Sequence, residues 1–127
     1  MQETIFKRNW PFDLKKNNLV TELPYIGKEY KISFDLFVTK FGAEDYQSVI
    51  HFTTSGNAEK YGDRTPGVWM CKTKKLHISS ALNGNVNNFY DDPTVQEEQK
   101  WINVEISQTL MDNKVWRQYG FLCFNNF

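Results

Sequence analysis

The sequence predicts an all-β domain, and three observations support this class. Several segments alternate between apolar and polar residues with a period of two, which is the pattern of a half-buried strand. Turn-forming residues separate these segments, and strand-favouring aromatic residues are abundant, with ten Phe, six Tyr and four Trp. Helical patterns are nearly absent, because only residues 94–100 have a helical composition. Many short strands between turns are typical of a sandwich or a barrel.

The first half of the chain supplies three expected strands. Residues 30–39 alternate cleanly and place five residues on one apolar face: Tyr30, Ile32, Phe34, Leu36 and Val38. Residues 47–54 carry apolar residues on both faces, as in a strand that is buried on two sides. Pro66 opens the third expected strand, and a proline at the start of a strand removes no ladder hydrogen bond. Residues 72–75 are expected to form the turn that follows.

The second half continues the pattern. A strand is expected over residues 76–82, and the Asn83-Gly84 pair after it is a strong hairpin signal. Residues 85–90 form the returning segment, and residues 94–100 are expected to form at most one or two helical turns. Another strand is expected over residues 101–108, with three residues directed inward: Ile102, Val104 and Ile106.

The last expected strand covers residues 115–124 and stops close to Phe127. A sandwich usually needs further strands to cover its sheets after such a hairpin. We therefore expect either a sandwich that is incomplete at its C-terminus or an edge that pairs with a partner chain.

Length and charge limit the classes of function. A chain of 127 residues suits one domain with a buried core, so we expect residues 1–127 to form a single domain. Fifteen basic residues balance fifteen acidic residues, which argues against binding to the phosphates of nucleic acid. No apolar run reaches the roughly 18 residues of a membrane span, and the N-terminus lacks the apolar run of a signal peptide.

Three parts of the chain carry a resemblance to a known superfamily. They are YKISFDL at 30–36, SVIHFTTSGN at 48–57 with KYGDRTPGVW at 60–69, and LHISSALNGN at 76–85 with WINVEISQ at 101–108. These segments resemble an uncharacterised group of extracellular, lectin-like domains of the concanavalin A-like and laminin-G-like superfamily, found in invertebrate proteins. The resemblance extends over about residues 19–125, and the run from Tyr61 to Pro66 is its most specific part.

The resemblance implies an antiparallel jelly-roll β-sandwich, a secreted or extracellular location and a role in recognition. It implies no particular ligand. It also implies further strands beyond residue 127.

The candidate ligand-binding residues are Tyr61, Asp63, Arg64 and Trp69. Arg64 offers five donors to an oxygen-rich ligand, and Tyr61 or Trp69 would stack on that ligand. The alternative is that Asp63 and Arg64 pair with each other or with the loop backbone and hold the turn. Both interpretations remain open from the sequence.

Two further sites are candidates. Asn88, Asp91 and Asp92 supply the oxygen ligands that calcium prefers, although an Asx turn before Pro93 is the favoured explanation. Cys71 and Cys123 form either one disulfide or two free thiols.

Catalytic patterns are missing from the sequence. Glycoside hydrolysis needs two carboxylates across the scissile bond, but Glu105 stands alone in its strand. His51, Asn57, Arg64 and Trp69 occur in the order of the galectin sugar-binding residues, but Thr53 stands where the galectin spacing requires Asn.

We therefore expect a non-catalytic recognition module that binds carbohydrate or acts in adhesion, with a glycan or an extracellular protein as its partner. The alternative is a protein–protein or self-assembly module, such as a homo-oligomer, that completes its sheet with another chain. A degenerate glycoside hydrolase is the least favoured hypothesis.

Overall fold

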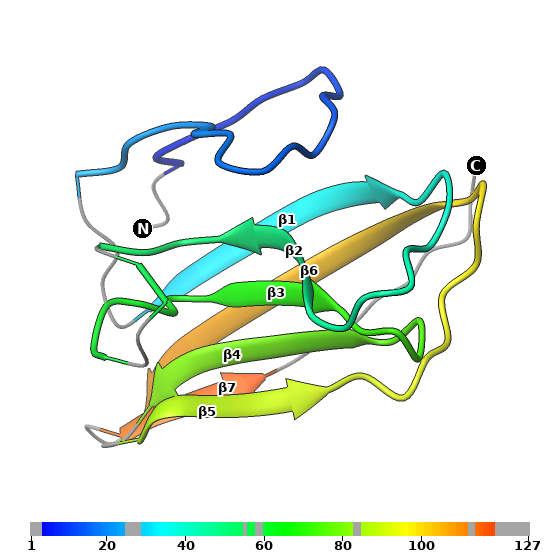
Figure 1. The fold of residues 1–127 in the computed structure, drawn as a ribbon. Helices are drawn as coiled ribbons and strands as arrows, with labels where there is room; N and C mark the ends of the chain where they lie inside the picture. Colours follow the sequence, from blue (N-terminus) through cyan, green and yellow to red (C-terminus); the bar gives the residue numbers. More distant parts are fainter. Residues whose placement is uncertain are drawn as a thin grey trace.

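The structure is a computed structural model that describes residues 4–24, 29–54, 56–57, 60–82, 85–111 and 114–118. Within these ranges the chain forms seven strands and no helix, in agreement with the predicted all-β class. The strands make two antiparallel sheets, and the sheet of β1, β6 and β7 lies behind the other sheet in the view of Figure 1. The strands are β1 (Tyr30–Phe37), β2 (Gln47–His51), β3 (Gly67–Met70), β4 (Leu76–Leu82), β5 (Asn85–Asp91), β6 (Trp101–Met111) and β7 (Lys114–Gln118).

The three-stranded sheet follows the order β1-β6-β7, and the four-stranded sheet follows the order β2-β3-β4-β5. β1 and β6 pair over eight positions, from Tyr30 opposite Gln108 to Phe37 opposite Trp101. In β6 the predicted inward residues are buried, with exposures of 5% or less: Ile102, Val104 and Ile106. The predicted alternation is therefore confirmed here.

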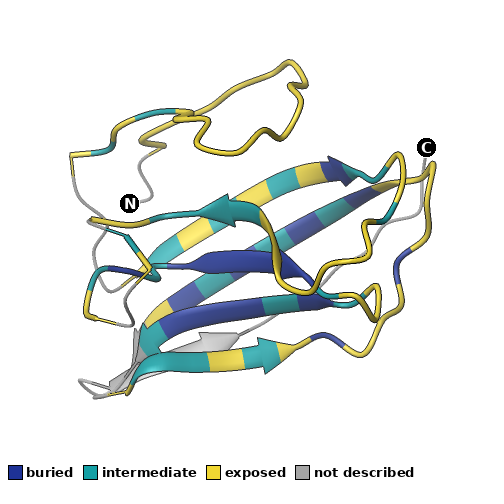
Figure 2. Ribbon diagram, viewed as in Figure 1, coloured by how far each residue is buried: buried dark blue, intermediate teal, exposed yellow. Residues whose placement is uncertain are grey.

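The hydrophobic core lies between the two sheets. The three-stranded sheet contributes Leu36, Ile102, Val104 and Ile106, and the four-stranded sheet contributes Val68, Met70, Leu76 and Ile78. Figure 2 shows the buried residues on the strands that face each other across this layer. Each such side chain contributes about 1.5–3 kcal/mol when it leaves water, so this layer holds the two sheets together.

A polar contact also joins the sheets at one end of the core. The hydroxyl groups of Tyr30 on β1 and Ser80 on β4 lie 2.8 Å apart. Both hydroxyls donate to Oε1 of Gln108 on β6, over 3.2 Å from Tyr30 and 3.1 Å from Ser80. Because a buried polar group needs a partner, this network helps to fix the position of one sheet relative to the other.

The structure differs from the sequence predictions in two elements. The strand expected over 47–54 ends at His51 and forms an edge of its sheet, and its residues are exposed or half-buried, so it is not buried on both faces. Residues 94–100 form no helical turn, and backbone bonds anchor them instead. Gln96 N–H donates to the Lys74 carbonyl and Gln99 N–H donates to the Val38 carbonyl, each over 2.8 Å.

Ahead of β1 lies a segment without regular structure, and every residue from 4 to 20 is exposed. This segment runs along the upper side of the molecule in Figure 1. Among the described residues, no helix has the length and apolar character needed to cross a membrane.

Candidate functional site

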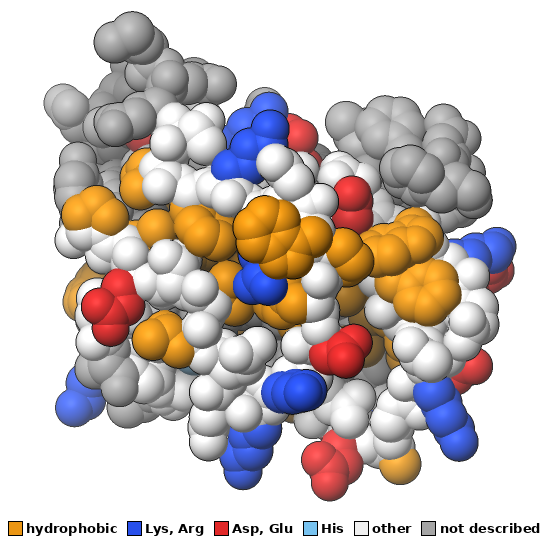
Figure 3. All heavy atoms as spheres, turned by 90° about the horizontal axis from the view of Figure 1, so that it is seen from above, with side chains coloured by type: hydrophobic (Ala, Val, Ile, Leu, Met, Phe, Trp, Pro, Cys, Tyr) orange, Lys and Arg blue, Asp and Glu red, His pale blue; other side chains and the backbone are white. Residues whose placement is uncertain are grey.

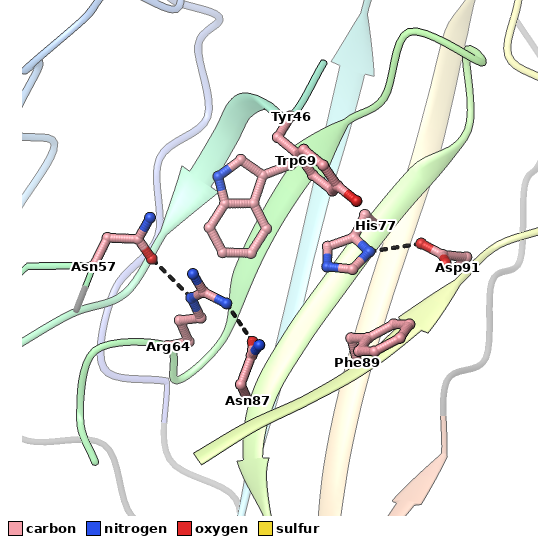
Figure 4. A pocket seen from close by; sticks show the side chains of 8 residues that line it. All are labelled: Tyr46, Asn57, Arg64, Trp69, His77, Asn87, Phe89 and Asp91. Carbon is pink, nitrogen blue, oxygen red and sulfur yellow. Dashed lines mark hydrogen bonds and ion pairs between the residues drawn. The ribbon is translucent and has the colours of Figure 1, made fainter. Parts of the chain in front are cut away.

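A pocket of about 490 Å³ lies on the outer face of the four-stranded sheet (Figure 4). The position of the pocket follows from the alternation of side chains between the two faces of the sheet. Val68 and Ile78 point into the core, so their neighbours Trp69 and His77 point to the opposite face. The register then aligns Trp69 with His77, and His77 with Asp91, across β3, β4 and β5. The pocket is lined by Asn57, Arg64, His77, Asn87 and Asp91 and by the rings of Tyr46, Trp69 and Phe89.

Trp69 lies within the layer of side chains that covers the sheet. Although it stands on the outer face, only 7% of its surface is exposed. The indole ring extends over Gly67, where an added Cβ would overlap the ring carbon Cη2. The glycine therefore makes room for the ring. The imidazole rings of His51 and His77 lie on either neighbouring strand, with centroids 5.4 Å and 5.9 Å from the indole.

Arg64 lies over the Trp69 ring, with its guanidinium carbon 5.2 Å from the ring centroid. Its Nε–H donates to Oδ1 of Asn57 over 2.7 Å, and its Nη1 donates to Oδ1 of Asn87. Asn87 is held in turn by Ser79, whose hydroxyl donates to the same oxygen over 2.9 Å. A cation over an aromatic face is favourable by about 0.5–2 kcal/mol, so stacking and hydrogen bonds together fix the guanidinium.

His77 occupies the other side of the pocket. Its Nδ1 lies 2.6 Å from Oδ1 of Asp91 on the adjacent strand. The imidazole stacks on Phe89 with ring centroids 5.1 Å apart, and it forms a T-shaped pair with the ring of Tyr46, with centroids 5.2 Å apart. Phe89 and Tyr46 remain 56% and 57% exposed. The pocket therefore combines fixed polar groups with aromatic surface that a ligand could cover.

The structure brings together two of the four predicted ligand-binding residues. Arg64 and Trp69 are in contact and line the pocket. Tyr61 is 65% exposed but does not line the pocket. Asp63 is fully buried, and its Oδ2 accepts a hydrogen bond from the Lys60 N–H over 3.2 Å.

Asp63 contacts its own loop and β2. Its backbone carbonyl contacts Nε2 of His51. Gly62 before it has a φ of 88°, a left-handed conformation that glycine adopts at low cost. Asp63 thus holds the loop, as the alternative interpretation proposed, whereas Arg64 bonds to residues of the pocket and not to the carboxylate of Asp63.

The three candidate calcium ligands do not share one loop. Asn88 and Asp91 both lie within β5, three positions apart, so their side chains point to opposite faces of the sheet. Asp91 bonds to His77 in the pocket, and Asp92 is buried. In the part of the chain that the structure describes, no three His, Cys, Asp or Glu side chains are grouped so that they could hold a metal ion.

Cys71 lies at the turn between β3 and β4, beside Asp45. Burial raises the pKa of the Cys71 thiol, and the charges of Asp45 and Asp91 raise it further. The pKa of Asp45 is lowered, mainly because its Oδ1 accepts a hydrogen bond from the Lys72 N–H over 3.0 Å. Cys123 lies outside the described residues, so the bridge from Cys71 to Cys123 stays a prediction.

Sequence reasoning did not assign His77, Asn87 and Phe89 to the ligand site. A signal was present, because Asn87, Phe89 and Asp91 alternate along one face of β5. Their use depends on the register that sets His77 opposite Asp91, and that pairing is not visible from local patterns.

Comparisons with protein-family models, with curated proteins and with solved structures gave no match to this chain. The function is therefore inferred from the site itself.

Proposed function

We propose that this protein is a non-catalytic carbohydrate-recognition module and that the outer-face pocket is its sugar site. One observation carries the proposal. The guanidinium of Arg64 is held over Trp69 by the side chains of Asn57 and Asn87, next to the exposed ring of Phe89. Sugars are recognised by fixed planar polar groups that bond to hydroxyls and by aromatic rings that stack on the C–H face of the sugar.

The rigidity of the polar groups favours this function. Arg64 already has its hydrogen-bond partners before any ligand arrives, and Asn87 is fixed by Ser79. Side chains that are ordered in advance lose little conformational entropy when the ligand binds. The volume of about 490 Å³ also falls within the usual range for small-molecule sites.

The carboxylates of the pocket favour binding over hydrolysis. Among the described residues that line it, Asp91 is the single acid, and its Oδ1 is bonded to His77. Glycosidases place one carboxyl group on either side of the scissile bond. We therefore propose a lectin-like role in adhesion or glycan recognition and no enzymatic activity.

We also propose a jelly-roll fold and an extracellular location for this module. Two antiparallel sheets around one apolar layer support a jelly-roll sandwich of the concanavalin A-like type. We propose an extracellular location, since the glycans that such modules recognise are displayed there.

The direct test is a glycan-array screen of the purified protein in calcium and again in chelator. We expect wild type to bind a related set of glycans and Arg64→Ala to lose about tenfold or more in affinity, because hydrogen bonds from a charged group are lost. Lys31→Ala is the control, since Lys31 pairs with Glu105 on the outer face of the other sheet. Binding that disappears in chelator would show that glycan recognition needs a divalent cation. A blank array from folded protein would overturn the sugar site.

A second candidate function, self-association, is favoured by the segment ahead of β1. Its apolar side chains are exposed, and Trp10 and Leu19 reach 64% and 72%. Figure 3, which views the molecule from this side, shows hydrophobic side chains gathered across the surface. In part of the segment the apolar residues alternate, at Trp10, Phe12 and Leu14, as they do in a strand.

An extended apolar segment of this kind can add as a strand to a sheet edge. Among the described strands, β1 and β2 each form an edge of their sheet. The partner we propose is a second copy of the chain, whose segment would pair with one of these edges.

Sedimentation velocity over a range of concentrations tests this candidate. We expect wild type to self-associate and the double variant Trp10→Ser, Phe12→Ser to sediment as a monomer. Tyr61→Ser is the matched control, because Tyr61 is an equally exposed aromatic residue, at 65%, in a different loop. A wild-type protein that stays monomeric at every concentration would rule out self-association.

A further inference from the structure

The polar groups of the pocket are divided into a donor side and an acceptor side. On the donor side, Asn57 and Asn87 each use the side-chain oxygen to accept a hydrogen bond from Arg64. The oxygen of Asn87 accepts a second bond from Ser79. The amide nitrogens of both asparagines can only donate, as can the guanidinium of Arg64.

The acceptor side is formed by His77 and Asp91. An ionised carboxylate can only accept hydrogen bonds, so the 2.6 Å contact places the proton of neutral His77 on Nδ1. Nε2 of that tautomer carries a lone pair and accepts. Figure 4 shows this second ring nitrogen turned away from Asp91, toward the space between His77 and Arg64.

The charges of the pocket cancel. Arg64 contributes one positive charge and Asp91 one negative charge, so the two cancel in the form of the pocket that has a neutral His77, since the other lining residues carry no charge. A pocket without net charge gives no electrostatic advantage to an acidic ligand. The exposed ring of Phe89 adds an apolar surface beside the acceptor side.

We infer, resting on the proposed function, that the pocket binds an uncharged pyranose through two neighbouring hydroxyl groups. One hydroxyl oxygen accepts hydrogen bonds from the side of Arg64 and Asn87, and the next hydroxyl donates to Nε2 of His77. Asp91 is a positioning residue, because it selects the histidine tautomer that accepts. The ring of Phe89 covers the C–H face of the sugar.

The first part of the test needs no ligand. Long-range proton–nitrogen NMR spectra report which ring nitrogen of a histidine carries the proton. We expect the Nδ1–H form of His77 in wild type and a mixture of both forms in Asp91→Ala. Asp91→Asn should also give a mixture, because an amide can donate as well as accept and no longer selects one tautomer. An Nε2–H form in wild type would overturn the inferred role of Asp91.

The second part measures affinity by NMR titration with the methyl glycosides of glucose, galactose and mannose and with those of the matching uronic acids. We expect an uncharged glycoside to bind at least about fivefold more tightly than its uronic acid, and Asp91→Ala to weaken that binding by a similar factor. Asp91→Asn should reduce the discrimination against the uronic acid, because the negative charge beside His77 is removed and the charge of Arg64 remains.

The outcomes separate the two proposals. Stronger binding of the uronic acids to wild type would overturn the uncharged-sugar inference and leave the carbohydrate site standing. If neither sugar series binds to protein that is folded by its NMR spectrum, the proposed function is overturned, and this inference with it.

Discussion

The guanidinium of Arg64 lies 5.2 Å from the centroid of the Trp69 ring, and that ring extends over Gly67. Three residues that are close in the chain thus form one stack on the outer face of β3. The indole can extend over residue 67 because that residue has no side chain. Changes at residue 67 should therefore reach the pocket through Trp69.

We predict that Gly67→Ala displaces the Trp69 ring. The added methyl group would overlap Cη2 of the indole, and an overpacked site of this kind costs about 1–3 kcal/mol. Tryptophan fluorescence should shift to longer wavelength, the urea midpoint should fall, and sugar binding should be lost. Gly56→Ala is the control, because nothing lies within 4 Å of a Cβ at that position. An unchanged emission spectrum in Gly67→Ala would contradict the described position of the ring.

We predict that protonation of Asp45 lowers the stability of the fold in acid. Its pKa is lowered from 3.8, chiefly by the hydrogen bond from the Lys72 N–H. The charged carboxylate therefore stabilises the fold above pH 3.8, and this contribution is lost as the pH falls through the lowered pKa. Wild type should be more stable than Asp45→Asn at neutral pH, with the difference shrinking under more acidic conditions.

Urea denaturation of both proteins from neutral pH to below pH 3.8 measures this difference. Asp13→Asn serves as the control, since Asp13 lies in the exposed segment ahead of β1. A gap between wild type and Asp45→Asn that widens in acid would contradict the prediction.

Local sequence patterns predicted the strands well where one face is buried. Alternation identified the inward residues Ile102, Val104 and Ile106, because a period of two directly reflects burial of one face. It failed at residues 47–54, where apolar residues on both faces indicated a doubly buried strand. Only Gln47–His51 of that run form a strand, and its residues are exposed or half-buried at the edge of the sheet, because the position of a strand depends on which strands pair.

The site was predicted only in part for the same reason. Arg64 and Trp69 were identified from residue type, and the structure places them in contact. His77 and Asp91 are 14 residues apart and meet only through the register of β4 and β5. Asp63 was selected as a ligand because it lies in the run from Tyr61 to Pro66, but the fold buries it completely.

The reactivity of Cys71 offers a further prediction. Burial, followed by the charges of Asp45 and Asp91, raises the pKa of its thiol, so less of it is thiolate at a mildly alkaline pH. In a reduced Cys123→Ser background, we expect alkylation of Cys71 to be slower than that of a small thiol such as cysteine. Asp45→Asn should accelerate it, because one neighbouring negative charge is removed. Equal rates in the presence and absence of denaturant would contradict this prediction.

Removal of the side chain is predicted to lower the stability of the fold at Asp63 but to leave it almost unchanged at Tyr61. The carboxylate of Asp63 is buried and accepts a hydrogen bond from the Lys60 N–H, so Asp63→Ala removes a buried side chain and the partner of this partly buried N–H group. We expect a loss of about 1–3 kcal/mol in the free energy of unfolding. Tyr61 is 65% exposed, and Tyr61→Ala should change stability by no more than about 0.5 kcal/mol. Neither side chain lines the pocket, so both variants should retain sugar affinity when folded. Urea denaturation and sugar titration of the two variants give the answer, and a loss of affinity in a stable Tyr61→Ala protein would extend the site to that loop.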